Sequence, residues 1–328
     1  MKKLKILYML FLIVIIPIQT NNAQIKKVAQ AGMQFLKVNP SAHAAAMGGA
    51  FSMIGKDASA LFLNPAGIAY VQSDFDVFLS QVDWFADIKY SAGAAVVNLG
   101  DYGDIGVSFI LPDYGEIIGT QVASNEQGYV ETGNVSVGAY SVGLAYATSF
   151  SDKFSIGAQI KYVDQNLGES MIDTSGTVKN NDAAGFGFDF GTIFYPGFES
   201  LRFGITIRNF SGQFQYEETP FQLPLTFIIG AAMDVLDLFG KHDNSFVVSL
   251  EALHPRDYTE RIHLGGEYTF MDMISLRMGY KFNYDLEGLS AGVGFNKVIY
   301  GVGIRLDYSY SDFDIFGSIN RLSLGLYF

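Results

Sequence analysis

Several residue types and patterns are scarce in this 328-residue chain, and each scarcity excludes a class of protein. Cysteine is absent, so no disulfide can hold the fold and no thiol can act as a nucleophile or metal ligand. Acidic residues (33) outnumber basic residues (21), and the formal charge of −12 excludes nucleic acid as an expected partner, because nucleic acid selects basic surfaces. Downstream of the N-terminal segment, no apolar run approaches the roughly 20 residues of a transmembrane helix.

The N-terminus has the pattern of a secretory signal peptide. Lys2, Lys3 and Lys5 precede an apolar run over residues 6–16, and small and polar residues follow as far as Ala23. The alternative is a membrane anchor, but the run is too short to span a bilayer comfortably. We predict a signal peptide over residues 1–23. No cysteine follows it, so lipid anchoring through that residue is also excluded.

The composition of the remaining chain fits an exported strand protein. Hydrophobic residues make up 49% of the sequence and aromatic residues 15%, and 36 residues are glycine. Glycine is costly inside most strands, but on the concave wall of a barrel it relieves crowding. Export without helical spans, combined with many aromatic residues and glycines, favours an outer-membrane protein.

Fourteen segments alternate apolar and polar residues. In 274–282, for example, Ile274, Leu276 and Met278 alternate with Ser275 and Arg277. This period of two is typical of strands with one apolar and one polar face, and a soluble sandwich would show it too. Export and composition favour a membrane barrel, with the apolar face toward lipid. The predicted strands are 75–84, 88–99, 104–112, 134–149, 154–165, 183–195, 201–210, 224–236, 245–254, 261–270, 274–282, 289–296, 300–312 and 319–328.

The connections between these strands alternate in length. Several connections after even-numbered strands are short, at 150–153, 196–200, 271–273 and 297–299. The long ones, at 113–133, 166–182 and 211–223, follow odd-numbered strands. Two connections deviate: 237–244 is longer although it follows an even-numbered strand, and 83–87 is short although it follows the first strand. Outer-membrane barrels have short periplasmic turns and longer outer loops, so we predict that the long connections form the outer rim. An even strand number also lets the last strand pair with the first, which removes both open edges.

Charged residues alternate with the apolar residues of the predicted strands and are expected to face the lumen. A charge facing lipid near the bilayer midplane would cost roughly 2–4 kcal/mol. The signs are mixed, which favours pairing across the lumen or to a plug over a selectivity ring. The predicted lumen-facing charges are Arg202, Arg208, Glu251, Arg261, Glu267, Arg277, Arg305 and Asp307.

Residues 24–72 do not follow the strand pattern. Ser41 can cap a short helix over the alanines that follow, and Asp57 can cap a second over 58–63. Pro65 ends the second helix, and Asn64-Pro65-Ala66-Gly67 is a turn signal. We therefore predict an all-β membrane protein, a 14-stranded antiparallel outer-membrane β-barrel over residues 73–328. A short helical plug over residues 24–72 is expected to sit in the barrel mouth.

The same N-terminal region resembles a known family. The string from Phe35 to Ala50, followed by Asp57-Ala-Ser-Ala and Asn64-Pro65-Ala66-Gly67, is similar to the N-terminal signature of the PorV/PorQ family, which belongs to the FadL-like outer-membrane barrels. His43 stands where arginine is usual, and Leu63 where an aromatic residue is usual. The residues of this plug motif are Asn39, Pro40, Met47, Gly48, Gly49, Asp57, Asn64, Pro65 and Gly67.

The resemblance implies a location and two alternative roles. It implies a protein of the outer membrane of a Gram-negative, Bacteroidetes-like cell, with 14 strands and an N-terminal plug. PorV-like members serve type IX secretion, where they receive exported proteins from the translocon and deliver them to an attachment complex. FadL-like relatives take up fatty acids or aromatic hydrocarbons through the lumen. The partners implied are membrane lipid and either a secreted protein with translocon subunits or a hydrophobic small molecule.

No pattern in the sequence indicates an enzyme. The chain has four histidines, and no HExxH, GxSxG or Ser/His/Asp arrangement accompanies them. His263 alone falls on a predicted strand face that points to the lumen. We therefore expect no catalytic, cofactor-binding or metal-binding residues. Between the two roles, the charged lumen face and the long polar loops favour a carrier of exported proteins over a porter of hydrophobic molecules.

Overall fold

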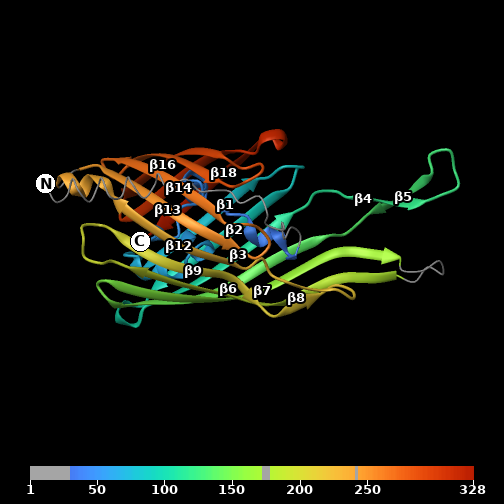
Figure 1. Ribbon diagram of the computed structural model, residues 1–328, viewed down its shortest axis with the longest axis horizontal. Coiled ribbons are helices and arrows are strands. Elements are labelled where there is room, and N and C mark those ends of the chain that lie inside the picture. Colours follow the sequence, from blue (N-terminus) through green and yellow to red (C-terminus); the bar gives the residue numbers. More distant parts are fainter. Residues whose placement is uncertain (1–29, 172–177, 241–242) are drawn as a thin grey trace.

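The chain folds into a closed antiparallel β-barrel of 14 strands, which confirms the predicted fold class (Figure 1). The computed structural model describes residues 30–171, 178–240 and 243–328, so the expected signal peptide lies outside the described residues. Closure is made by the first and last strands, with Asp76 opposite Tyr327 and Asp83 opposite Asn320. In the described part of the chain, no helix has both the length and the apolar character to cross a membrane.

The strands fall close to the predicted segments. Those of the barrel are β1 (Phe75–Asp83), β2 (Lys89–Asn98), β3 (Asp104–Asp113), β6 (Gly138–Ser151), β7 (Phe154–Met171), β8 (Val178–Phe194), β9 (Arg202–Ser211), β12 (Thr226–Asp234), β13 (Ser245–Pro255), β14 (Arg261–Phe270), β15 (Ile274–Phe282), β16 (Leu289–Ile299), β17 (Val302–Asp312) and β18 (Ser318–Tyr327). Three 3₁₀ turns lie in their connections: η4 (Gly100–Tyr102), η5 (Val235–Phe239) and η6 (Asp314–Phe316).

The alternation along each strand separates an outer from an inner face. On β15, Leu276 is 57% exposed on the outside, whereas its neighbour Arg277 is 8% exposed on the inside. The register places Arg277 opposite Glu267 of β14. The apolar exterior can face lipid. No backbone group of the described wall is left unsatisfied there, because the sheet is closed and every barrel strand is hydrogen-bonded on both sides.

Short connections gather at one end of the barrel, here called the short-turn rim. One difference from the prediction concerns residues 297–299, which were expected to form a turn. Strand β16 instead continues through Ile299, and the chain reverses at Tyr300 and Gly301. Both reversing residues have positive φ (51° and 85°), as two-residue hairpin turns require. The connections of this rim are 99–103, 152–153, 195–201, 235–244, 271–273 and 300–301.

At the opposite end, here called the long-loop rim, residues predicted to form loops form strands instead. The connection after β3 contains a hairpin of β4 (Ile118–Val122) and β5 (Tyr129–Asn134), which projects well beyond the barrel (Figure 1). The connection after β9 contains β10 (Gln213–Gln215) and β11 (Pro220–Gln222). Strands β7 and β8 extend into the expected loop 166–182. The prediction of loops was wrong here. A two-stranded ribbon outside the membrane needs no apolar face, so its sequence lacks the alternation from which strands were predicted.

The N-terminal segment forms four short helical turns before the first strand. They are η1 (Gln34–Lys37), α2 (Ala42–Ala46), η2 (Ala58–Phe62) and η3 (Pro65–Tyr70). The predicted caps form: the Ser41 side chain accepts from the Ala44 N–H, and that of Asp57 from the Ser59 N–H. Asn64 and Pro65, predicted as a turn, instead begin η3. Asn64 caps it and Pro65 occupies its first turn, where no N–H is needed.

Candidate functional site: the plugged lumen

Residues 30–71, hereafter the plug, run through the lumen from one rim to the other. At the long-loop rim, the Gly32 N–H donates to the Gln222 carbonyl at 3.2 Å, and Lys37 Nζ lies 2.5 Å from Asp257 Oδ2. At the short-turn rim, Asn98 Nδ2 donates to the Val71 carbonyl at 3.0 Å. The Tyr70 ring also packs edge-on against Tyr195 there. The plug is therefore anchored at both ends of the barrel.

Glycines on the inner wall let the plug backbone touch the strands. A Cβ at Gly279 of β15 would lie 2.0 Å from the Gly48 nitrogen, and one at Gly191 of β8 would lie 1.8 Å from Asn64 Oδ1. Such distances are far below any van der Waals contact, so a larger residue at either position would displace the plug. Part of the glycine content is thus explained by contacts with the plug.

The first part of the plug motif lies against β1, β14, β15 and β18. The Asn39 carbonyl accepts from Arg321 Nε at 3.0 Å, and the Pro40 carbonyl accepts from Ser80 Oγ at 2.6 Å. Met47 is fully buried. Gly48 and Gly49 have positive φ (64° and 82°), a conformation that glycine adopts without strain, and they turn the chain after α2.

The second part of the motif ties the plug to itself and to β8. Asn64 Nδ2 donates to the Ser52 carbonyl at 2.9 Å and to the Thr192 carbonyl of the wall at 3.4 Å. Pro65 packs where Gly191 leaves room. A Cβ at Gly67 would lie 2.5 Å from the Gly55 carbonyl oxygen, so this position also needs a close approach. Asp57 caps η2 and lies 3.8 Å from a guanidinium nitrogen of Arg305.

Two of the predicted lumen charges, Glu251 and Arg202, bond directly to the plug backbone, and Arg305 is linked to it through Asp76 of β1. Glu251 accepts hydrogen bonds from the Ser52 N–H at 2.6 Å and from Ser52 Oγ at 3.1 Å. Arg202 Nε donates to the Met53 carbonyl at 2.7 Å. Arg305 donates to both oxygens of Asp76, at 2.7 and 2.6 Å. Asp76 in turn accepts from the Ala58 N–H at 3.1 Å, which links the wall to η2.

Three more form a chain of ion pairs on the wall. Arg277 donates to Glu267 on one side and to Asp307 on the other. Glu267 also meets the plug, because His43 Nε2 lies 2.7 Å from its Oε2. His43 of the plug thus contacts a wall carboxylate.

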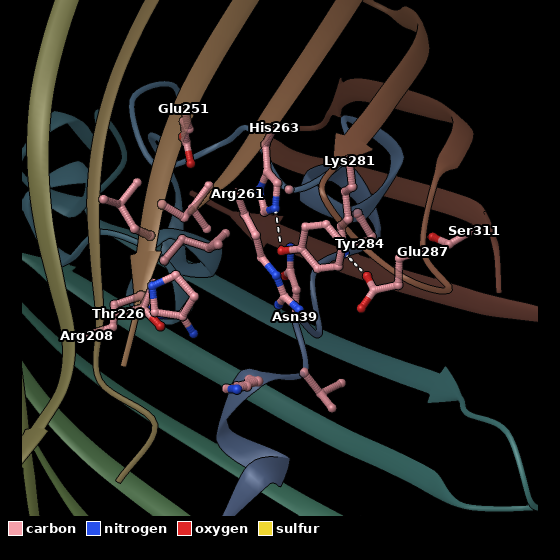
Figure 2. A pocket seen from close by; sticks show the side chains of 18 of the residues that line it. Asn39, Arg208, Thr226, Glu251, Arg261, His263, Lys281, Tyr284, Glu287 and Ser311 are labelled. Atoms are coloured by element: carbon pink, nitrogen blue, oxygen red, sulfur yellow. Dashed lines mark hydrogen bonds and ion pairs between the residues drawn. The ribbon is translucent and has the colours of Figure 1, made fainter. Parts of the chain in front are cut away.

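The last two predicted lumen charges, Arg208 and Arg261, line a cavity of about 130 Å³ near the long-loop rim (Figure 2). His263 also faces it, and its Nε2 is 2.7 Å from the hydroxyl of Tyr284. Lys281 pairs with Glu287 across the same cavity. Burial lowers the pKa of Lys37 at its margin, although the adjacent Asp257 opposes this shift.

The eight predicted charges therefore hold the plug, pair with one another on the wall or face the cavity, and Glu251 and Arg208 both contact the plug and line the cavity. Sequence reasoning missed the wall residue Asn209, which adopts a positive φ of 60° where β8 and β9 lose register. Its N–H donates to Asp189, which pairs with Lys161 at 2.8 Å. It also missed Tyr284 as a cavity residue, because Tyr284 lies in a loop that carries no periodic signal, and Trp84, which was predicted only as the last residue of a strand.

Solved structures with the same fold include two toluene transporters and a FadL homologue. The chain is similar to the toluene transporter TbuX of Ralstonia pickettii, with 14% identity, a TM-score of 0.57, and coverage of 86% of this chain and 96% of that one. It is also similar to the toluene transporter TodX of Pseudomonas putida (14% identity, TM-score 0.55, coverage 86% and 96%). A FadL homologue of Pseudomonas aeruginosa is also similar, with 14% identity, a TM-score of 0.51, and coverage of 88% of this chain and 97% of that one. At these identities the likeness shows the fold alone.

The sequence itself matches a family model. A comparison with curated proteins gave no match. The model of the type IX secretion system membrane protein PorP/SprF, however, matches residues 105–318, well over half of the chain and most of its barrel strands. Together with the closed barrel, this places the protein in the outer membrane. The chain belongs to the PorP/SprF family of type IX secretion system membrane proteins.

Proposed function

We propose that this protein is a carrier component of type IX secretion that binds an exported protein at its long-loop rim. Membership of a secretion family supports a role in export. The N-terminal resemblance covers residues 34–69, outside the matched range, and supports a PorV/PorQ-like plug and shuttle mode within that role. The proposal assigns no catalytic step to the chain. Its partners are the exported protein and subunits of the translocon or attachment complex.

The observation that carries the proposal is the β4–β5 hairpin. These two strands form a sheet of their own, so in the described chain their outer edges have no strand partner. The hairpin also exposes apolar side chains, among them Val122 (91% exposed) and Ile118 (56% exposed). Free strand edges next to exposed apolar residues are suited to adding a strand from an extended polypeptide.

The interior of the barrel is less suited to a porter. A porter for hydrophobic molecules needs a lumen pocket lined mainly by apolar side chains. The cavity in the outer lumen is instead lined by charged residues such as Arg208, Glu251 and Lys281, and its volume is about 130 Å³. The FadL-like fold keeps the porter as the alternative function, but charge on the wall and backbone contacts along the plug favour the carrier.

The test is a pair of substitutions on the hairpin. Ile118→Ser combined with Val122→Ser removes exposed apolar surface without touching the barrel. We expect the amount of type IX cargo released into the medium to fall severalfold, while the level of the protein in the outer membrane stays unchanged. Tyr300→Ser is the control, because Tyr300 is also an exposed large apolar side chain but lies on the short-turn rim.

The result is read from cargo release by the two variants. Normal release by the hairpin variant, with cross-linking of cargo to it at the wild-type level, would contradict the carrier role assigned to this hairpin. Equal loss in the hairpin variant and in Tyr300→Ser would mean that the effect is not specific to the long-loop rim.

A further inference from the structure

Three arginines face the cavity in the outer lumen without a carboxylate partner. Arg208, Arg261 and Arg321 all line it, and no described carboxylate lies within 4.0 Å of their nitrogens. Arg321 is 4% exposed. A buried charge without a counterion is costly, so groups of this kind are normally paired.

Arg321 donates to the Asn39 carbonyl and to Ser311 Oγ, both at 3.0 Å, whereas Arg208 and Arg261 each leave a donor unused. Arg208 makes one long hydrogen bond, 3.5 Å to the Leu36 carbonyl, and its Nε has no partner. Arg261 is stacked between the rings of Tyr258 and Tyr284, with its guanidinium carbon 4.1 and 3.9 Å from their centres. Its Nε has no partner either. Stacking holds a guanidinium in place but does not neutralise its charge.

The acidic groups nearby are already engaged. Asp257 binds Lys37, and Glu287 binds Lys281. Glu251 accepts from Ser52 of the plug. The lining holds five lysines and arginines against two glutamates, so the cavity keeps an excess of positive charge.

A histidine beside the arginines also lines the cavity. His263 is 6% exposed, and its Nδ1 lies against Gly49 of the plug. Figure 2 shows its side chain beside Arg261 and Tyr284, facing the same space. The unpartnered, buried Nε atoms of Arg208 and Arg261 at this cavity point to a bound polar group.

We propose that this cavity binds a compact oxyanion, a carboxylate or a phosphate group. Guanidinium groups match the geometry of both, and their hydrogen bonds to anions are short and strong. The volume of about 130 Å³ is close to that of the roughly 150 Å³ cavity that holds benzene, so it fits one small anionic group and not an acyl chain. This inference does not depend on the carrier role.

The chain carries its own reporter for this site. Trp84 is its single tryptophan and lines the cavity, and the Arg321 guanidinium lies over the Trp84 ring at 5.8 Å. We expect the fluorescence of the full-length protein in neutral detergent to change saturably when inorganic phosphate or acetate is added at constant ionic strength. Two further samples, nanodiscs of phosphatidylglycerol and of phosphatidylcholine without added anion, tell a lipid headgroup from a free anion.

Substitutions of the unpaired arginines test the site directly. Arg208→Gln and Arg261→Gln should each weaken phosphate binding at least tenfold, which corresponds to about 1.4 kcal/mol. Arg208→Lys keeps the charge and should lose less than Arg208→Gln. Lys153→Gln is the matched control, since Lys153 is exposed on the short-turn rim and should bind as the wild type does. The electrophoretic mobility of unheated and heated samples is compared to check that each variant forms a barrel.

The outcomes separate cleanly. A saturable signal with phosphate or acetate supports a free anion, and a signal in phosphatidylglycerol discs alone supports a headgroup; both uphold the oxyanion site. No saturable signal in any sample overturns it. A signal of unchanged affinity in both arginine-to-glutamine variants also overturns it, because the anion would then bind elsewhere.

Discussion

At the scale of single residues, the wall obeys a strict alternation whose two faces have opposite requirements. Outward positions such as Leu276 are apolar and exposed, and inward ones such as Arg277 are buried among partners. The sequence alone predicted this alternation, since the period of two is a local property. It could not give the partners, because Arg305 and Asp76 are 229 residues apart and meet only when the barrel closes.

Neighbouring substitutions on β15 should therefore behave differently. Leu276→Arg puts a charge against lipid and should lower the unfolding free energy in vesicles by about 2–4 kcal/mol, with poor insertion. Arg277→Leu leaves the lipid-facing surface intact and should insert normally, although it removes the partner of Glu267 and Asp307. Insertion yields and urea unfolding in lipid vesicles measure both effects. Equal yields and stabilities for the two variants would show that the faces of β15 are assigned wrongly.

Two glycines on adjacent strands offer a second residue-scale test. Gly279→Ala would place a Cβ 2.0 Å from the Gly48 nitrogen and should displace the plug, at a cost of at least about 1–3 kcal/mol. Gly266→Ala on β14 meets nothing nearer than Phe246 at 3.7 Å and should be tolerated. Single-channel conductance in planar bilayers should rise only for Gly279→Ala. A closed channel in that variant would mean that the contact does not hold the plug.

At the scale of elements, a strand can be predicted from the sequence when its two faces meet different environments. The faces of the barrel strands do, because one meets lipid and the other the lumen, and the positions of these strands were predicted closely. Ribbon β4–β5 has water on both faces, so its residues carry no alternation and it was taken for a loop. The start of η3 at Asn64 was missed for a related reason: Asn-Pro is both a turn signal and a helix start, and only packing against β8 decides between them.

Cysteine labelling tests how these elements lie across the membrane. Ser124→Cys, between β4 and β5, and Gln30→Cys, where the described plug begins, are both exposed at the long-loop rim. Both should react with a membrane-impermeant maleimide on intact cells, and the chain has no other cysteine to interfere. Asp152→Cys, in a short turn, is the control and should react only after lysis. The reverse pattern would invert the orientation.

At the scale of the whole molecule, the barrel has the fold of the toluene transporters, but its lumen is filled by the plug and carries charged side chains. The plug is anchored at both rims and bound along its length by wall carboxylates and arginines, as at Glu251 and Arg202. Between the plug and the wall lies a charged cavity of about 130 Å³. The surfaces left for larger partners are the outer ribbons, which agrees with a family that serves secretion.

The most direct test of this account is the fate of exported proteins in a strain that lacks the gene. We predict that type IX cargo accumulates inside the cells and falls severalfold in the medium, and that the wild-type gene restores release. Growth on hydrophobic carbon sources should not change. Normal release of cargo, together with lost growth on a hydrophobic carbon source, would contradict the account and would instead identify the protein as a porter.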